Sequence, residues 1–377
     1  MPPALLARPH RPSTLLSLPS ELLNEIGLYL VQSPFSLSSF MRLCKTTSEA
    51  GAYVRYSSVH IQGQQGRNLL VSLLSGSAVS RFYCGLIKRL WFRGWCDTDM
   101  LLRSTLLAQV LAMLENLITV WLEVSPVDTG YLANRLKRQG IIREPLHPTQ
   151  ATVYDILNED PPDRVPLPNL RHVRISGDHS IVQMAIYRPL AELDLREYLS
   201  QAEFARFLMS TEHLPIQETL VGLTLRLEAP VKLASALVLI SETFPNLKSL
   251  SLDQVSLGWE VFFDSLQYSE TTLASLQHLL FNRRSRAALP RRDKVFKPEI
   301  PVHKVRACLE RFSGTHPMLQ KFGVHGFVWD RNFLNTFVRH EVDRGSNEWD
   351  VIFEREFNPE IYVPDLAVLC SEVVYDW

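Results

Sequence analysis

Hydrophobic and polar positions divide the chain into two regions with different spacing. Near the N-terminus, apolar residues at Leu22, Leu23, Ile26 and Leu30 recur every three or four positions, which predicts a helix capped by Ser20. A turn at 33–34 then leads into a second helical run that ends near Lys45. Short helices cannot bury much surface alone, so the pattern predicts that they dock on this chain or on another protein.

From residue 87 onward, one apolar spacing recurs eight times. Each copy has an apolar residue, two others, a second apolar residue, one other and a third apolar residue, as in Leu220-x-x-Leu223-x-Leu225. The alternation within each copy predicts a short strand with one buried face. The copies begin at Ile87, Leu117, Leu170, Leu190, Leu220, Leu247, Leu276 and Leu319.

Helical runs lie between these copies, over residues 100–114, 199–209, 231–244, 259–266 and 302–312. Alternating strands and helices predict an α/β fold with a parallel sheet. In four copies a proline stands one or two positions before the first apolar residue. A proline, a short strand and a helix that recur in this order about every 20–30 residues are typical of a leucine-rich-repeat solenoid. The units of such a solenoid bury their leucines against their neighbours.

The predicted repeats are irregular. Two intervals, of 53 and 43 residues, require insertions, and the longer one contains the proline-rich, acidic stretch 157–168. The Asn or Cys that regular repeats carry eight residues after the first leucine is replaced, for example by Trp95 and Ser125. An irregular α/β domain that is not a solenoid is therefore the alternative interpretation.

The N-terminal stretch resembles the F-box. The opening of that family, Leu-Pro-x-Glu-Leu-x-x-x-Ile-x-x-Tyr/Phe-Leu, is matched at Leu18, Pro19, Glu21, Leu22, Ile26, Tyr29 and Leu30. The second family helix is matched by Leu37, Phe40, Leu43, Cys44 and Lys45. Thr46 and Thr47 stand where the family usually has a Trp, a departure expected to weaken the third helix. The resemblance divides the chain into a disordered tail (1–13), an F-box (14–61) and an irregular leucine-rich-repeat domain (62–377).

F-box proteins are substrate receptors of SCF-type ubiquitin ligases, and repeats like these follow many fungal F-boxes. The resemblance implies that the module binds a Skp-type adaptor, and through it a cullin. The adaptor-binding residues it implies are Leu18, Pro19, Leu22, Ile26, Leu30, Leu37, Phe40 and Leu43. The alternatives are an ordinary amphipathic helix pair packed on the domain, and a stand-alone scaffold whose F-box is vestigial.

The residues between the apolar strand positions are expected to face away from the core and to bind a protein substrate. Trp and Arg dominate the energies of many interfaces, which favours this face as the substrate site. The candidates are Trp91, Trp121, Arg174 and Asp194, in one row with Thr224 and Ser251, and Arg196, Arg226 and Asp253, in the neighbouring row. The alternative for the two tryptophans is burial beneath the linker that follows the F-box.

Composition narrows the range of partners. With 39 Lys and Arg against 40 Asp and Glu, the 377-residue chain has a formal net charge of −1, which argues against nucleic-acid or anionic-membrane binding. Its longest apolar stretch, 101–124, is interrupted by polar residues and predicts no membrane span. Prolines in the first twenty residues exclude a signal peptide, and five scattered cysteines fit free thiols in a reducing compartment. The expected location is the cytoplasm, the nucleus or both.

Motifs for catalysis or cofactor binding are missing from the sequence. No Gly-x-Gly, Gly-Lys or Gly-x-Ser-x-Gly occurs, so the sequence predicts neither a nucleotide-binding loop nor a nucleophile elbow. The 97–99 stretch, Asp-Thr-Asp, is interpreted as a helix cap in preference to a metal site. We therefore expect no enzyme, no cofactor and no metal, with a cryptic hydrolase as the remote alternative.

Two segments near the C-terminus complete the sequence predictions. The basic run 283–297 is interpreted as a solvated loop, with a nuclear-import signal or a patch for an anionic partner as the alternatives. Residues 349–357 alternate apolar and polar positions, which predicts that Val351 and Phe353 form a last strand pairing with residues 322–324.

Overall fold

The computed structural model describes residues 18–31, 33–94, 100–142, 166–228, 231–255, 273–284, 302–324, 327–331 and 337–341. The chain divides into two compact units, residues 1–60 with 363–377 and residues 61–362. Strand β1 (Ser58–Ile61) spans the boundary between them. The predicted tail 1–13, the 97–99 stretch, most of the 157–168 insertion, the helical run 259–266 and most of the basic run lie outside the described residues.

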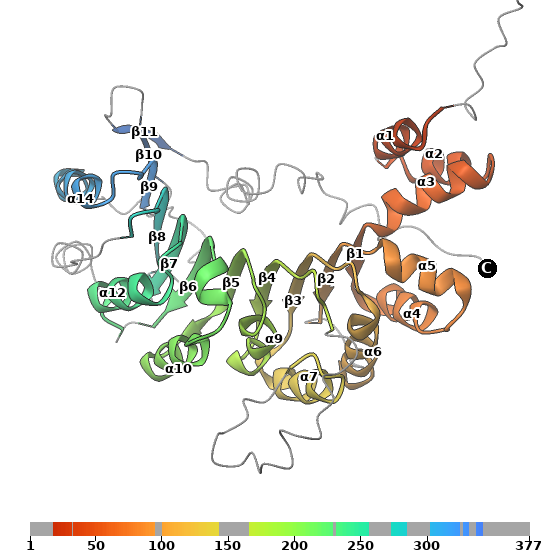
Figure 1. Ribbon diagram of the computed structural model, residues 1–377, viewed down its shortest axis with the longest axis horizontal. Coiled ribbons are helices and arrows are strands. Elements are labelled where there is room, and N and C mark those ends of the chain that lie inside the picture. Colours follow the sequence, from red (N-terminus) through yellow and green to blue (C-terminus); the bar gives the residue numbers. More distant parts are fainter. Residues whose placement is uncertain are drawn as a thin grey trace, which may run out of the picture. The chain divides into compact units, whose positions relative to one another are not determined.

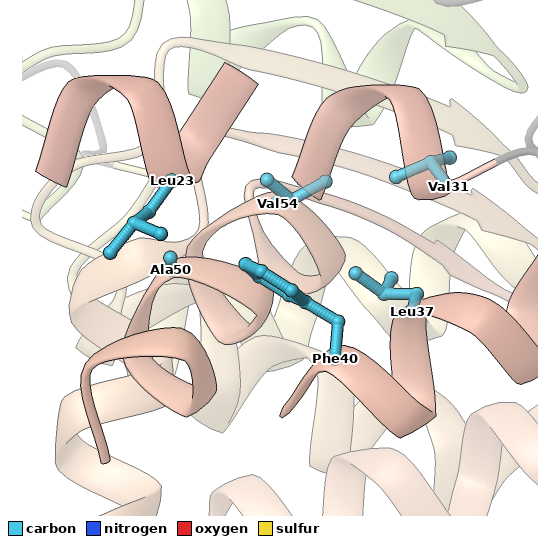
Figure 2. Packing of buried hydrophobic residues seen from close by; sticks show 6 residues of the cluster. All are labelled: Leu23, Val31, Leu37, Phe40, Ala50 and Val54. Carbon is cyan, nitrogen blue, oxygen red and sulfur yellow. The ribbon is translucent and has the colours of Figure 1, made fainter. Parts of the chain in front are cut away.

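The described part of the first unit consists of three helices around one core. These are α1 (Ser20–Leu30), α2 (Pro34–Met41) and α3 (Lys45–Tyr56). Their buried side chains point toward one another in Figure 2: Leu23, Val31, Leu37, Phe40, Ala50 and Val54. Gly27 lets α1 approach α3 closely, because a Cβ at this position would lie only 3.0 Å from Val54 Cγ2.

Three details of this unit differ from the sequence predictions. Pro19, and not Ser20, is the N-cap of α1, and it makes no side-chain cap hydrogen bond. The second helix ends at Met41, and Lys45 begins α3. Thr47, in the region where the family usually has a Trp, is completely buried and closes a capping box with Cys44. The Cys44 N–H donates to Thr47 Oγ1 at 3.1 Å, so Thr47 provides a hydrogen-bond acceptor for a free N–H group at the start of α3.

The second unit has the predicted mixed α/β architecture. Its strands follow one another in the sheet in chain order, with parallel pairing from β2 to β9 and antiparallel pairing from β9 to β11. The parallel strands are β2 (Arg89–Arg93), β3 (Thr119–Glu123), β4 (His172–Ser176), β5 (Glu192–Leu199), β6 (Gly222–Leu227), β7 (Ser249–Val255), β8 (His278–Arg284) and β9 (Lys321–Val324). They are followed by β10 (Phe327–Arg331) and β11 (Phe337–Glu341).

Helices connect the strands of this unit and lie along one side of the sheet (Figure 1). The helices in the described residues are α4 (Gly63–Leu73), α5 (Ala78–Leu86), α6 (Met100–Met113), α7 (Pro126–Arg138), η2 (His179–Ile181), α9 (Gln183–Ile186), α10 (Gln201–Thr211), α11 (Ile216–Thr219), α12 (Leu233–Thr243) and α14 (Val302–Thr315). Four of them, α6, α10, α12 and α14, confirm predicted helical runs. Among the described residues no single helix has the length and hydropathy of a membrane span, and α4 with α5 reaches them only as a pair bent by 117°.

Each of the eight apolar copies forms one of the strands β2 to β9, preceded by its first apolar residue. All three apolar positions in every copy are at most 3% exposed. The second positions align across the whole sheet: Leu90, Val120, Val173, Leu193, Leu223, Leu250, Leu279 and Phe322. At the start of each strand, one carbonyl accepts from two successive N–H groups of the next copy, as Val221 O does from Lys248 and Ser249. The copies are therefore structurally equivalent despite their unequal spacing.

Asparagine side chains add a second link between successive copies. Asn116, Asn169 and Asn246 each stand immediately before the first apolar residue of a copy. Their Nδ2 atoms donate to the carbonyls of Gly85, Glu115 and Glu218, two residues before the first apolar residue of the preceding copy, at 2.7, 3.0 and 2.8 Å. This polar link lies before the strand, whereas regular repeats carry theirs after it.

The prediction for the last strand was wrong about its partner. Strand β9 pairs with β8 on one edge and with β10 on the other, through Phe322 and Trp329 among other positions. Both edges of β9 are thus occupied, so Val351 and Phe353 have no free edge of β9 to pair with. Residues 349–357 themselves lie outside the described residues.

Candidate functional site

The predicted adaptor-binding residues divide between the surface and the core of the three-helix unit. Pro19, Leu22 and Leu43 are exposed, Leu22 by 49% and Leu43 by 61%. Leu18, Ile26 and Leu30 are half-buried and pack against the core. Leu37 and Phe40 are buried within it, so in this conformation they hold α2 against its neighbours.

The exposed side of α1 carries further apolar surface. Tyr29 is 82% exposed and lies seven residues after Leu22, on the same side of the helix. Phe35, at the start of α2, is 89% exposed. Leu28 is 47% exposed, but it lies about a third of a turn away from Leu22 around α1. The motif contained Tyr29 as a matching position, whereas nothing in the sequence distinguished Phe35 from a core residue.

In the second unit, one row of side chains runs across the side of the sheet opposite to the apolar core. We call this side the sheet face. The strand register places Trp91, Trp121, Arg174, Asp194, Thr224 and Ser251 next to one another in this order. This is the row expected from the sequence, because side chains alternate between the two faces of a strand.

Aromatic and cationic side chains stack at the β2 end of the row. The Trp91 and Trp121 rings are nearly parallel, with an interplanar angle of 5° and centroids 4.2 Å apart. The Arg174 guanidinium lies 4.5 Å from the centroid of Trp121, within cation–π distance. Both tryptophans are half-buried, so this stack fixes their orientation while leaving part of each ring accessible.

Ion pairs fix the arginines in the middle of the sheet face. Asp194 Oδ2 accepts from Arg174 Nε at 2.7 Å and from Arg196 Nε at 2.8 Å. These three side chains are 15–19% exposed, so solvent screens their interaction only partly. Two guanidinium charges thus converge on one carboxylate oxygen.

A second carboxylate organises the neighbouring strands. Asp253 Oδ2 accepts from the Tyr198 hydroxyl at 3.4 Å and lies 3.8 Å from Arg226 Nε. Between Asp194 and Tyr198 the register of β5 against β6 shifts, so that Tyr198, and not Arg196, lies opposite Arg226. The sequence prediction placed Arg196 and Arg226 in one regular row and missed Tyr198. The apolar spacing does not show where such a register shift moves the side chains.

Among the described residues, the buried side-chain atoms of the sheet face without a hydrogen-bond partner include Thr119 Oγ1, Trp121 Nε1, Asp194 Oδ1 and Ser249 Oγ. Buried polar groups are almost always hydrogen-bonded, so such atoms call for a polar partner. A polar ligand on the sheet face would supply partners for these atoms. Among the described residues no group of three His, Cys, Asp or Glu side chains could hold a metal ion.

Comparison of the chain with models of known protein families and with curated proteins found no match. The functional argument therefore depends on the geometry of the two surfaces.

Proposed function

We propose that the chain is the substrate-recognition subunit of an SCF-type ubiquitin ligase. In this proposal the α1–α3 unit is an F-box that docks on a Skp-type adaptor, and through it on a cullin. The second unit is an irregular leucine-rich-repeat solenoid whose sheet face binds a protein substrate. The chain itself catalyses nothing, because ubiquitin transfer belongs to its partners in the ligase.

One observation carries the proposal. The three-helix unit completes its own core with Leu23, Leu37 and Phe40, yet it leaves Leu22 and Tyr29 exposed on one side of α1. Apolar side chains clustered on one helix face are typical of a helix that docks in the groove of a partner. Pro19, at the N-terminal end of the same helix, is also exposed and so accessible to a partner.

The sheet face supports the receptor part of the proposal. Its tryptophans, tyrosine and arginines belong to the residue types that contribute most to binding at protein interfaces. Stacking and ion pairs hold Trp121, Arg174 and Arg196 in place before any ligand arrives. Such preorganised side chains lose little conformational entropy on binding.

Affinity purification from cells tests this proposal. We expect the intact chain to copurify with a Skp-type adaptor and a cullin, and Leu22→Asp to lose both, because it places a charge in the docking face. Leu22 is a better position than Ile26, because Ile26 also packs against the core of the unit. If the intact chain captures neither adaptor nor cullin, the proposal is wrong, and the alternative of a stand-alone scaffold with a vestigial F-box is favoured.

A further inference from the structure

Two polar atoms of the sheet face discriminate between classes of ligand. Asp194 Oδ1, as a carboxylate oxygen, can only accept a hydrogen bond, whereas Trp121 Nε1 can only donate one. Within the described part of the chain both atoms are buried, and neither has a hydrogen-bond partner. The hydroxyls of Thr119 and Ser249 also have no partner, but a hydroxyl either donates or accepts and therefore excludes no ligand. A ligand that satisfies the first two atoms must carry both a donor and an acceptor.

The unpaired oxygen of Asp194 contrasts with the other oxygen of the same carboxylate. Oδ2 accepts from Arg174 Nε at 2.7 Å and from Arg196 Nε at 2.8 Å, whereas Oδ1 accepts from no described residue. Burying a charged oxygen without a hydrogen bond is unfavourable, so a donor from a ligand would stabilise it. The Asp194 side chain is 15% exposed and its terminal torsion is soft, so a small rotation presents Oδ1 to the surface.

We infer that the sheet face binds a substrate segment that places the side-chain amide of a Gln or an Asn between Trp121 and Asp194. The NH2 group of this amide donates to Asp194 Oδ1, and its carbonyl oxygen accepts from Trp121 Nε1. A carboxylate or phosphate group only accepts, so it would leave Asp194 Oδ1 without a donor and bring a second negative charge beside it. An ammonium or guanidinium group only donates, so it would leave Trp121 Nε1 without an acceptor.

The spacing of the two residues suits a single amide group. Trp121 lies on β3 and Asp194 on β5, with Arg174 of β4 between them in the row. The Arg174 guanidinium lies 4.5 Å from the centroid of the Trp121 ring, and Arg174 Nε lies 2.7 Å from Asp194 Oδ2. Two strand steps separate the backbones by about 9.6 Å, and an amide with a hydrogen bond at either end spans about 8 Å. Because both side chains contact Arg174 between them, the amide has less than the backbone distance to cover.

Selection from a library of random short peptides tests the inference. The library is selected on the immobilised full-length chain, and peptides that also bind the variant Trp121→Ala are discarded. We expect the remaining peptides to be enriched in Gln and Asn and depleted in Asp and Glu. Enrichment in Asp and Glu, an unchanged composition, or no peptide that depends on Trp121 would each overturn the inference.

A peptide recovered in this way permits a test that leaves the protein unchanged. In one synthetic copy its Gln or Asn is replaced by Glu or Asp, and the binding of both copies to the intact chain is measured by fluorescence anisotropy. We expect the acidic copy to bind about tenfold more weakly, because it loses a hydrogen bond and gains charge repulsion. Equal affinities would contradict the inference, because groups other than the side-chain amide would then satisfy the two atoms.

The variant Asp194→Asn should abolish this preference, because its own side-chain amide can donate to a carboxylate. We expect the ratio of the two affinities to fall from about tenfold to about twofold or less. If Asp194 only supports the structure, the variant weakens both copies equally and the ratio stays at about tenfold, which would overturn the inference. Glu123→Gln is the matched control, because it removes the same charge from the sheet face on β3. We expect it to leave the ratio unchanged.

The inference deepens the proposed function and rests on its receptor part, the sheet face as the substrate site, but not on adaptor binding. All these measurements use the purified full-length chain without the adaptor. Preference for the amide peptide without binding of a Skp-type adaptor would support the inference and contradict the proposed function. Adaptor binding without this preference would do the reverse, so the two failures are distinguishable.

Discussion

Asp194 is predicted to be the residue on which the order of the sheet face depends. Its Oδ2 atom is the shared acceptor for Arg174 and Arg196, and Arg174 in turn covers the ring of Trp121. The substitution Asp194→Asn keeps the size of the side chain and removes its charge. Both arginines then lose the carboxylate charge that they share, and the stack loses a group that holds Arg174 over the indole.

The size of the expected loss in the free energy of unfolding depends on how deeply these side chains are buried. Removing one partner of a fully buried ion pair costs about 3–5 kcal/mol, and removing one from an exposed pair costs at most about 1 kcal/mol. The side chains of Arg174, Asp194 and Arg196 are 15–19% exposed, so we expect Asp194→Asn to lower the free energy of unfolding by about 2–3 kcal/mol. Glu123→Gln is the matched control. Its partner Arg93 is 46% exposed, which predicts a loss below about 1 kcal/mol.

Urea unfolding followed by tryptophan fluorescence measures both variants. A lower midpoint with an unchanged slope reports lost stability, whereas a changed slope reports loss of two-state unfolding. We also expect the native-state emission of Asp194→Asn to change, because Arg174 no longer lies fixed over Trp121. If Asp194→Asn unfolds within about 0.5 kcal/mol of Glu123→Gln, the carboxylate does not organise the sheet face and the reasoning is refuted.

Three further predictions concern stability. Asn246→Ala removes the hydrogen bond to Glu218 O and is expected to cost about 1 kcal/mol in urea unfolding; no loss would mean that the link between copies is incidental. Burial lowers the pKa of His316, so the unfolded chain takes up a proton below about pH 6.5 before the folded chain does. Stability should therefore fall between pH 7.5 and 5.5, and fall less in His316→Asn; equal losses would contradict this cause. Ser200 Oγ accepts from the Glu203 N–H at the start of α10, so Ser200→Ala is expected to cost about 1 kcal/mol and to speed amide exchange in the first turn of α10.

The sequence was sufficient to predict the sheet because each strand obeys the same local rule. In every copy the three apolar positions are the ones that the fold buries, so Leu223 and Leu250 could be aligned without knowing the structure. The residues between the apolar positions must face the other side of the sheet, because side chains alternate along a strand. Trp121, Arg174 and Asp194 were therefore expected in one row. The class of fold and this row were thus predictable from spacing alone.

Other features depend on contacts that spacing does not encode. The register shift in β5 brings Tyr198 opposite Arg226, and apolar spacing alone does not identify which residue the shift places there. On α1 and α2, helical spacing identifies an apolar face but not what covers it. Leu37 and Phe40 were assigned to a partner, yet they complete the core of the unit, while Leu22 remains exposed.

The central claim is that α1 docks on a Skp-type adaptor through the side that carries Leu22. Its most direct test is the affinity of the purified full-length chain for the purified adaptor, measured by calorimetry for the intact chain, Leu22→Asp and Leu28→Asp. The two leucines are 49% and 47% exposed on different sides of the same helix, so the two charges differ only in where they point. We predict that Leu22→Asp weakens binding by about tenfold or more and that Leu28→Asp changes it by less than about twofold. Equal effects of the two substitutions, or no binding by the intact chain, would contradict the account.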